Sequence, residues 1–328
     1  MSEDKLKQAL LRIADIAASA ANASSDSDVD NYSDAGATTE TLGVCTPKSL
    51  PLELQIRAAK TAWAENPANS PMVGFLPQDG EVARAIANPL AIAVLTAKYW
   101  GPARRTLTVS FMDKTPTDLR NRILSHMNAW QCAITFVFTQ RTGQVRISRG
   151  SGGYWSYLGT DIQHIATNRQ TMNLQGFTMA MPDSEFHRVI RHETGHTLGF
   201  PHEHMRRQIV ALIDPQKAYA YFLRTQGWDK ATVDAQVLTP LDDKSIMGTP
   251  PDQTSIMCYQ LPGEITKNGK PILGGTDINP TDRTFCQRIY PPVGASLEVQ
   301  STYDTSEFVE EPVTLEGSLA VGAVATNG

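Results

Sequence analysis

The stretch "HETGHTLGFPHEH", residues 192–204, decides the fold because it gathers metal-binding side chains at the end of a predicted helix. His192 and His196 are four residues apart, so a helix places both rings on one face, about 5–6 Å apart at Cβ. That separation suits two zinc–nitrogen bonds of roughly 2.0–2.1 Å. Gly199 can adopt a positive φ and end the helix sharply. The chain then doubles back, which brings His202 to the same metal ion.

Three histidine ligands leave a fourth coordination position for water, which is typical of a catalytic rather than a structural zinc site. The sequence therefore predicts one Zn²⁺ per chain. Glu193 lies beside the first ligand but outside the row of ligands. We predict that it is the general base, which takes a proton from the water and passes it to a leaving amine. The histidines outside the pattern are expected to be ordinary core or surface residues: His126, His164, His187 and His204.

The helix that carries this motif is predicted to begin at Asp183 or Ser184, because either side chain can act as its N-cap. Its apolar stripe, with helical spacing, consists of Phe186, Val189 and Ile190. A second helix is expected over 115–132, with Leu119, Ile123, Met127 and Trp130 on one face. Strands are expected at 105–111, at 171–181, and twice within 133–148 around Thr142 and Gly143, with a glycine-rich loop at 148–161. This order of elements indicates a mixed α+β domain.

The motif also resembles a known family signature. "HETGHTLGFPH" matches the metzincin pattern HExxHxxGxxH, and metzincins have a methionine turn beneath the metal. Two segments are candidates for that turn, "SIMGT" at 245–249 and "SIMCY" at 255–259, and only the second has a tyrosine two residues after its methionine. That turn, together with Glu203 after the third histidine, makes the chain resemble the astacin family of zinc proteases, bacterial astacin-like peptidases in particular.

The resemblance covers roughly residues 105–292 and implies a mixed twisted sheet, an active-site helix and a mostly irregular C-terminal subdomain. It implies that Tyr259 is a switchable fifth ligand that leaves the zinc and donates a hydrogen bond to the oxyanion. Met257 would form a hydrophobic floor under the metal. Glu203 would either contact a new N-terminus after processing or serve as a buried structural acid. A peptide substrate would pair with an edge strand, expected within 169–176.

The resemblance also raises the question of latency, since most astacins are secreted as zymogens. The region before residue 105 is a candidate propeptide, in which a ligand would displace the zinc-bound water. Cys45 is one candidate because thiolates bind zinc well. Asp79 is the other, because astacin propeptides commonly use an aspartate. Cys132 and Cys286 lie near the positions of a family disulfide, and either that bond or two free thiols is compatible with the sequence.

The domain organisation follows from these assignments. We expect an N-terminal helix and flexible linker at 1–45, a helical pre-catalytic or propeptide-like region at 46–104, the protease domain at 105–292 and an acidic disordered tail at 293–328. The net charge of −5 argues against a nucleic-acid partner, which favours a basic surface. No apolar run reaches the roughly 18–20 residues of a membrane span. We expect a monomer that acts on proteins or peptides.

The predicted function is that of a zinc-dependent endopeptidase with a glutamate general base. The alternative is a catalytically silent metzincin-like pseudoenzyme that binds peptides, and a further alternative is hydrolysis of a non-peptide amide or ester. The sequence shows no cleavable secretory signal, because its N-terminus is acidic and lacks a continuous apolar core. The compartment therefore stays open between the cytoplasm and non-classical secretion, which the family resemblance favours.

Overall fold

A computed structural model of the chain describes residues 45, 48–69, 96–240 and 251–292. The chain divides into two units, Met1–Leu42 and Gly43–Gly328, and all of the described residues belong to the second. The predicted linker before residue 45, the candidate Asp79, the alternative turn at 245–249 and the tail at 293–328 lie outside the described residues. Within the described ranges, no helix is long and apolar enough to cross a bilayer.

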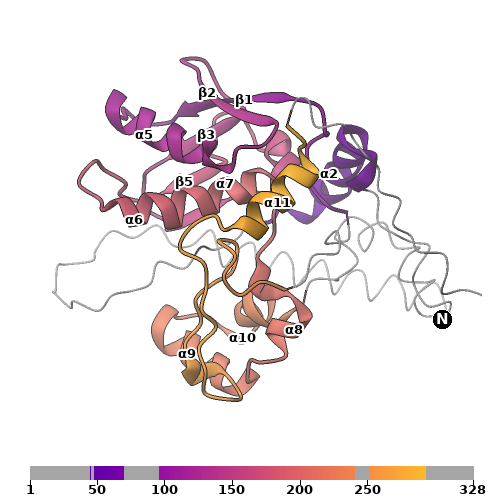
Figure 1. The fold of residues 1–328 in the computed structure, drawn as a ribbon, viewed down its shortest axis with the longest axis vertical. Helices are drawn as coiled ribbons and strands as arrows, with labels where there is room; N and C mark the ends of the chain where they lie inside the picture. Colours follow the sequence, from indigo (N-terminus) through magenta and orange to yellow (C-terminus); the bar gives the residue numbers. More distant parts are fainter. Residues whose placement is uncertain (1–44, 46–47, 70–95, 241–250, 293–328) are drawn as a thin grey trace, which may run out of the picture. The chain divides into compact units, whose positions relative to one another are not determined.

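A five-stranded mixed sheet forms the centre of the fold (Figure 1). Its order is β2-β1-β3-β5-β4, and only the β4–β5 pair is antiparallel. The strands are β1 (Arg105–Phe111), β2 (Ile134–Phe138), β3 (Val145–Ser148), β4 (Tyr154–Ser156) and β5 (Met172–Leu174). The two strands predicted within 133–148 both form, and they lie on either side of β1 instead of pairing with each other.

The sheet corrects the predicted substrate-binding edge. β5 lies inside the predicted range 169–176, but β3 and β4 flank it on both sides, so it has no free edge. The edge strand beside β5 is β4, which forms within the segment predicted to be a glycine-rich loop. The prediction failed because three residues are too few to show the period-two alternation that marks a half-buried strand.

Helices complete the α+β architecture, as predicted. The α-helices are α2 (Leu52–Glu65), α5 (Thr117–Met127), α6 (Asp183–Glu185), α7 (Arg191–Thr197), α8 (Arg207–Val210), α9 (Pro215–Gln226), α10 (Lys230–Val233) and α11 (Pro280–Ile289). Two π-helical turns are η5 (Phe186–Ile190) and η7 (Asp234–Leu238). The 3₁₀ turns are η1 (Pro67–Asn69), η3 (Asn128–Trp130), η4 (Gly159–His164), η6 (Glu203–Met205) and η8 (Gly263–Ile265).

The active-site helix is built from three consecutive elements, α6, η5 and α7, with a π-helical turn in the middle. The predicted cap is wrong: Pro182 is the N-cap residue and no side chain caps the helix. Asp183 instead lies in the first turn, where a carboxylate is stabilised by the helix dipole. Its side chain forms a 2.8 Å ion pair with Arg122 of α5, which ties the start of the active-site helix to its neighbour.

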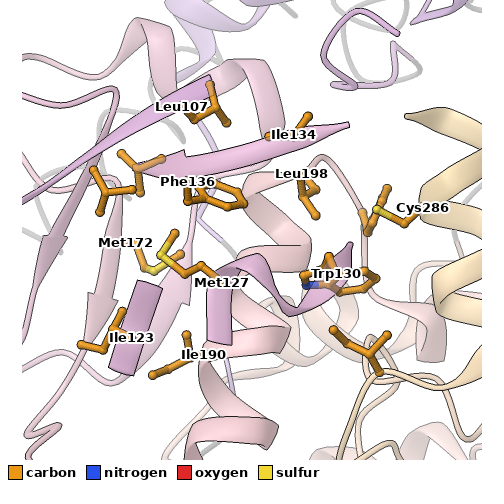
Figure 2. Packing of buried hydrophobic residues seen from close by; sticks show 14 of the residues in the cluster. Leu107, Ile123, Met127, Trp130, Ile134, Phe136, Met172, Ile190, Leu198 and Cys286 are labelled. Carbon is orange, nitrogen blue, oxygen red and sulfur yellow. The ribbon is translucent and has the colours of Figure 1, made fainter. Parts of the chain in front are cut away.

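One hydrophobic core lies between the sheet and the helices that pack on it. The predicted stripe of the second helix is fully buried there, from Leu119 to Trp130. Figure 2 shows Met127 and Trp130 in the same packed cluster as Phe136 of β2 and Ile190 of the active-site helix. Burial of a large apolar side chain contributes roughly 1.5–3 kcal/mol, so this cluster holds the active-site helix firmly against the sheet.

A second, smaller core lies beneath the active-site helix and involves α8, α9 and α10, which group together in Figure 1. Its buried residues include Cys45, Phe222, Cys258 and Tyr259. The methionine-turn segment at 255–259 therefore links the two cores, since Met257 belongs to the first and Tyr259 to the second.

Candidate active site

The turn after the active-site helix has the geometry predicted for Gly199, whose φ is +96°. The amide of Gly199 donates to the carbonyl of His196 (2.8 Å), and the amide of Phe200 donates to the carbonyl of Gly195 (2.9 Å). These two bonds form a complete Schellman motif. An added Cβ at Gly199 would also lie 2.9 Å from the carbonyl oxygen of Lys98. Glycine is therefore required here both for its backbone conformation and for the close approach.

The three predicted histidine ligands come together, as the spacing predicted. The Nε2 atom of His202 lies 3.1 Å from Nε2 of His192 and 2.9 Å from Nε2 of His196. Tetrahedral zinc with bonds of roughly 2.0–2.1 Å separates its nitrogen ligands by about 3.3 Å. The observed spacing is close to that value, and all three rings are buried.

Hydrogen bonds fix the tautomers of two of these rings. The Nδ1 atom of His192 lies 2.6 Å from the carbonyl oxygen of Ile256, and Nδ1 of His196 lies 2.8 Å from that of Phe200. A carbonyl oxygen only accepts, so each Nδ1 carries the hydrogen and each Nε2 presents a lone pair. Carbonyl groups orient metal-binding histidines in this way in many proteins.

The donor set fits a zinc ion. Lone pairs on neighbouring nitrogens that converge in a buried space repel one another unless a cation lies between them. Burial lowers the pKa of His192 to about 4 and holds the pKa values of His196 and His202 well below the usual value, so the rings stay neutral. Neutral imidazole is the form that binds metals. The three histidine rings and the Cys45 thiol form a cluster whose possible ligand atoms all lie within 4.8 Å of one another.

Cys45 occupies the position that the sequence assigned to a candidate latency ligand. Its Sγ lies 3.5 Å from Nε2 of His196 and 3.5 Å from Oε2 of Glu193. A sulfur bound to tetrahedral zinc at about 2.3 Å lies about 3.6 Å from the nitrogen ligands. Burial and the adjacent Glu193 raise the pKa of the thiol well above its usual value. A bound cation reverses that effect, because a metal-coordinating thiol is deprotonated.

Glu193 is almost fully buried beside the histidine cluster, with 1% of its surface exposed. Desolvation raises the pKa of its carboxyl group to about 8, while the hydrogen bond from Cys45 and the charge of Arg188 oppose the increase. A carboxyl group with a raised pKa that contacts the group in the fourth position is placed to accept a proton there.

Hydrogen bonds to Asp282 of α11 fix the methionine turn at 255–259. Asp282 accepts hydrogen bonds from the hydroxyl of Ser255 (2.5 Å) and from the amide of Ile256 (2.9 Å). Asp282 also completes a capping box with Asn279 at the start of α11. The cap of one helix therefore fixes the turn beneath the metal-binding residues.

Met257 lies directly under the active-site helix, as the predicted floor requires. A Cβ added to Gly195 would lie 2.3 Å from Sδ of Met257. Glu203 donates its amide to the carbonyl of Met257 (2.8 Å), and its carboxylate pairs with Nε of Arg206 (3.0 Å). In the uncut chain Glu203 thus forms a structural ion pair, and its contact with a new N-terminus after processing stays a prediction.

Tyr259 is buried among histidine rings, and its hydroxyl donates a hydrogen bond to the backbone carbonyl of Cys45. Its ring centroid lies 4.2 Å from that of His202 and 4.2 Å from that of His204. His204 was expected to be ordinary, and a single histidine outside a spacing pattern gave no signal of this contact. The other signal missed in the sequence was Gly195, whose lack of a side chain admits Met257.

A second group of possible ligands consists of His126, Asp183 and His187. Arg191 donates to Nδ1 of His126 (3.3 Å), which therefore carries its hydrogen on Nε2, the atom nearest Asp183. Arg122 also pairs with Asp183. The two guanidinium groups and the tautomer of His126 favour an ion-pair network here, not a metal site, so these histidines keep the ordinary role predicted for them.

Comparison with known proteins now assigns the class. The family model for Astacin, described as a peptidase family, matches residues 94–288, which is more than half of the chain. The chain belongs to the astacin family, and it is a zinc metalloendopeptidase of astacin type. A search of curated proteins found no match.

Three solved structures are similar to this chain to different degrees. A structure of myroilysin is 30% identical with a TM-score of 0.56, and the match covers 60% of this chain and 96% of that one. A crystal structure of myroilysin is 32% identical with a TM-score of 0.47, covering 60% and 86%. The hatching-enzyme zinc-protease high choriolytic enzyme 1 of the medaka Oryzias latipes is 21% identical with a TM-score of 0.39, covering 56% and 88%.

Proposed function

We propose that this astacin-family protease cleaves internal peptide bonds with one Zn²⁺ held by His192, His196 and His202. A bound zinc ion supplies a Lewis acid and lowers the pKa of a water molecule to about 7. Glu193 is the general base that accepts the proton of that water and returns it to the leaving amine. The observation that carries the proposal is the convergence of three Nε2 atoms beside a buried carboxyl group.

Tyr259 is the proposed donor to the oxyanion. Its hydroxyl already donates to a peptide carbonyl oxygen, that of Cys45, which lies at the histidine cluster. A substrate carbonyl that replaced this group would receive the same hydrogen bond. Burial and the neighbouring Cys45 and Glu193 raise the pKa of Tyr259 well above its usual value, so the phenol keeps the proton that it donates.

The substrate backbone is proposed to pair with the outer edge of β4. Lys48 forms an isolated parallel bridge with Tyr157, directly after β4, and its ammonium lies 5.4 Å from the centre of the Trp155 ring. An extended segment of the chain thus already uses this edge. A peptide that adds to a sheet edge gains main-chain hydrogen bonds without regard to its sequence.

We propose that the chain is latent while Cys45 lies at the histidine cluster. The Cys45 thiol is the fourth group of the cluster. The backbone carbonyl of Cys45 accepts the hydrogen bond of the Tyr259 hydroxyl, which is therefore not available to a substrate. The following segment is anchored to the protease domain: Asn69 donates to the carbonyl of Tyr99 (2.7 Å) and Asn66 to that of Trp100 (2.9 Å). Water and substrate therefore reach the site only after residue 45 moves away.

The test is digestion of a mixed peptide library by the zinc-loaded chain, read by mass spectrometry. The full chain carrying C45A is compared with the same chain carrying C45A and E193A. Internal cuts that the E193A chain does not make support an endopeptidase with Glu193 as base. Equal digestion by both chains would reject that role, and silence of both chains with zinc bound would favour the pseudoenzyme.

A further inference from the structure

The ring of His204 lies flat against Tyr259. Their centroids are 4.2 Å apart and their planes differ by 17°. His204 comes from η6, immediately after the third histidine of the motif, and none of its surface is exposed. A planar ring in this position offers a packing surface to the phenol.

The far edge of the same ring is anchored to the smaller core. Its Nε2 lies 3.0 Å from the carbonyl oxygen of Gln236 in η7, so Nε2 carries the hydrogen and donates it. Its Nδ1 atom is buried and has no hydrogen-bond partner among the residues that the structure describes. An unpaired buried nitrogen is unfavourable. The ring is therefore held by one directional bond at one edge, while its face supports Tyr259.

The Tyr259 ring also packs on the three-histidine cluster. The His202 ring is 4.2 Å away at an interplanar angle of 46°, and the His192 ring is 6.0 Å away at 15°. The phenol thus packs on two proposed ligands and on a histidine that is not in the ligand cluster, and the His202 and His204 rings, 5.0 Å apart, lie on neighbouring sides of it. The hydroxyl lies at the far end of the side chain, so a small rotation about χ1 displaces it more than any other atom of the ring. The surfaces that pack on the ring therefore decide where the hydroxyl lies.

We propose that His204 is a positioning residue for Tyr259: its ring, anchored on the Gln236 carbonyl, fixes the phenol in the orientation that directs the hydroxyl at a bound peptide carbonyl. This inference rests on the proposed role of Tyr259 as the oxyanion donor. His204 touches neither the substrate carbonyl nor the reacting water in this account. It acts only through the ring that it supports.

Kinetics of four variants test the proposal in the full chain carrying C45A. H204L and H204M remove both the planar ring and the donor, whereas H204Q keeps a planar group and a donor at the same reach. We expect H204L and H204M to lower kcat about three- to tenfold, the range of an aromatic contact, with KM changed less than about twofold. We expect H204Q to keep most of the kcat of the C45A chain. H164L, which replaces a histidine outside the site, is the matched control and keeps it.

The same variants in a Y259F background separate positioning from general loss of structure. Because His204 acts through the Tyr259 hydroxyl, H204L and H204M should lower kcat no further once that hydroxyl is removed. An equal loss in both backgrounds would overturn the proposal, as would an unchanged kcat in H204L and H204M. Using two apolar replacements guards against a single variant that fails to fold.

A spectroscopic test does not depend on activity. The full chain is labelled with fluorotyrosine, and the fluorine resonance of Tyr259 is identified by its loss in Y259F. We expect one sharp signal for the unmodified chain and for H204Q, and a broadened or doubled signal for H204L, with H164L unchanged. A single sharp Tyr259 signal in H204L would overturn the inference. If the chain never cleaves peptides but this signal broadens, the proposed function fails and the positioning contact stands.

Discussion

Tyr259 donates its hydroxyl hydrogen bond to the backbone carbonyl of Cys45, the residue whose thiol lies 3.5 Å from both His196 and Glu193. One residue thus contacts the proposed general base, a proposed metal ligand and the proposed oxyanion donor together. Its side chain and its carbonyl occupy the positions that a water and a substrate carbonyl need. The proposed latency of the chain rests on this relationship.

Removal of the general base should separate metal binding from catalysis. E193A is expected to keep stoichiometric zinc, because Glu193 lies outside the three-histidine donor set. Its turnover should fall by roughly 10²–10⁴, the usual contribution of a positioned general base. Metal analysis and peptide cleavage, both in the C45A background, check the two halves of this prediction. Loss of zinc together with activity would show that Glu193 is structural.

Removal of the Tyr259 hydroxyl should affect the transition state more than substrate binding. Y259F keeps the ring that packs against His202 and His204. We expect kcat to fall by up to about 10²–10³, the range for loss of an oxyanion donor, with little change in KM. Steady-state kinetics on a peptide found in the library screen provide the measurement. An unchanged kcat would remove Tyr259 from the mechanism.

Gly195 should be intolerant of even a methyl group. In G195A the new Cβ would lie 2.3 Å from Sδ of Met257 and 3.0 Å from the Trp130 ring. Overpacking of this kind costs about 1–3 kcal/mol, which exceeds the roughly 0.5–1 kcal/mol gained by replacing a helical glycine with alanine. We expect a lower Tm and weaker zinc retention. G150A is the control, since its Cβ would come no closer than 3.4 Å to another side chain.

The Cys132 and Cys286 thiols are free and neighbour each other closely enough that each shifts the pKa of the other. We expect mild oxidation of the folded chain to join them, since neighbouring thiols need little movement to form a bond. The crosslink would raise stability by about 2–4 kcal/mol. Peptide mapping and thermal unfolding check this. If oxidant raised the Tm of C132A as much as that of the unmodified chain, the stabilisation would have to come from other cysteines.

The sequence was sufficient to predict the histidine cluster and much of the core. The spacing of His192, His196 and His202 specifies a helix followed by a sharp turn, and local geometry alone brings the three rings together. The burial of the apolar stripe from Leu119 to Trp130 was also predictable, because helical periodicity persists over several turns.

Features that depend on distant contacts were harder to predict. Cys45 reaches the cluster from 147 positions before His192 along the chain, and no local pattern fixes such a contact. The edge strand β4 is too short to alternate visibly. His204 acquires its contact only when the 255–259 turn folds back beneath the active-site helix, so its role depends on tertiary structure.

The most direct test of the account is the activity of the full, unprocessed chain with and without the Cys45 thiol. Zinc-loaded wild type and C45A are compared on one peptide substrate, with C132A as a control that removes a cysteine outside the metal cluster. We predict that C45A cleaves the peptide while wild type and C132A stay nearly silent. Without the thiol, residue 45 is held at the cluster only through its carbonyl, which a substrate carbonyl can replace. Equal activity of wild type and C45A would contradict this prediction.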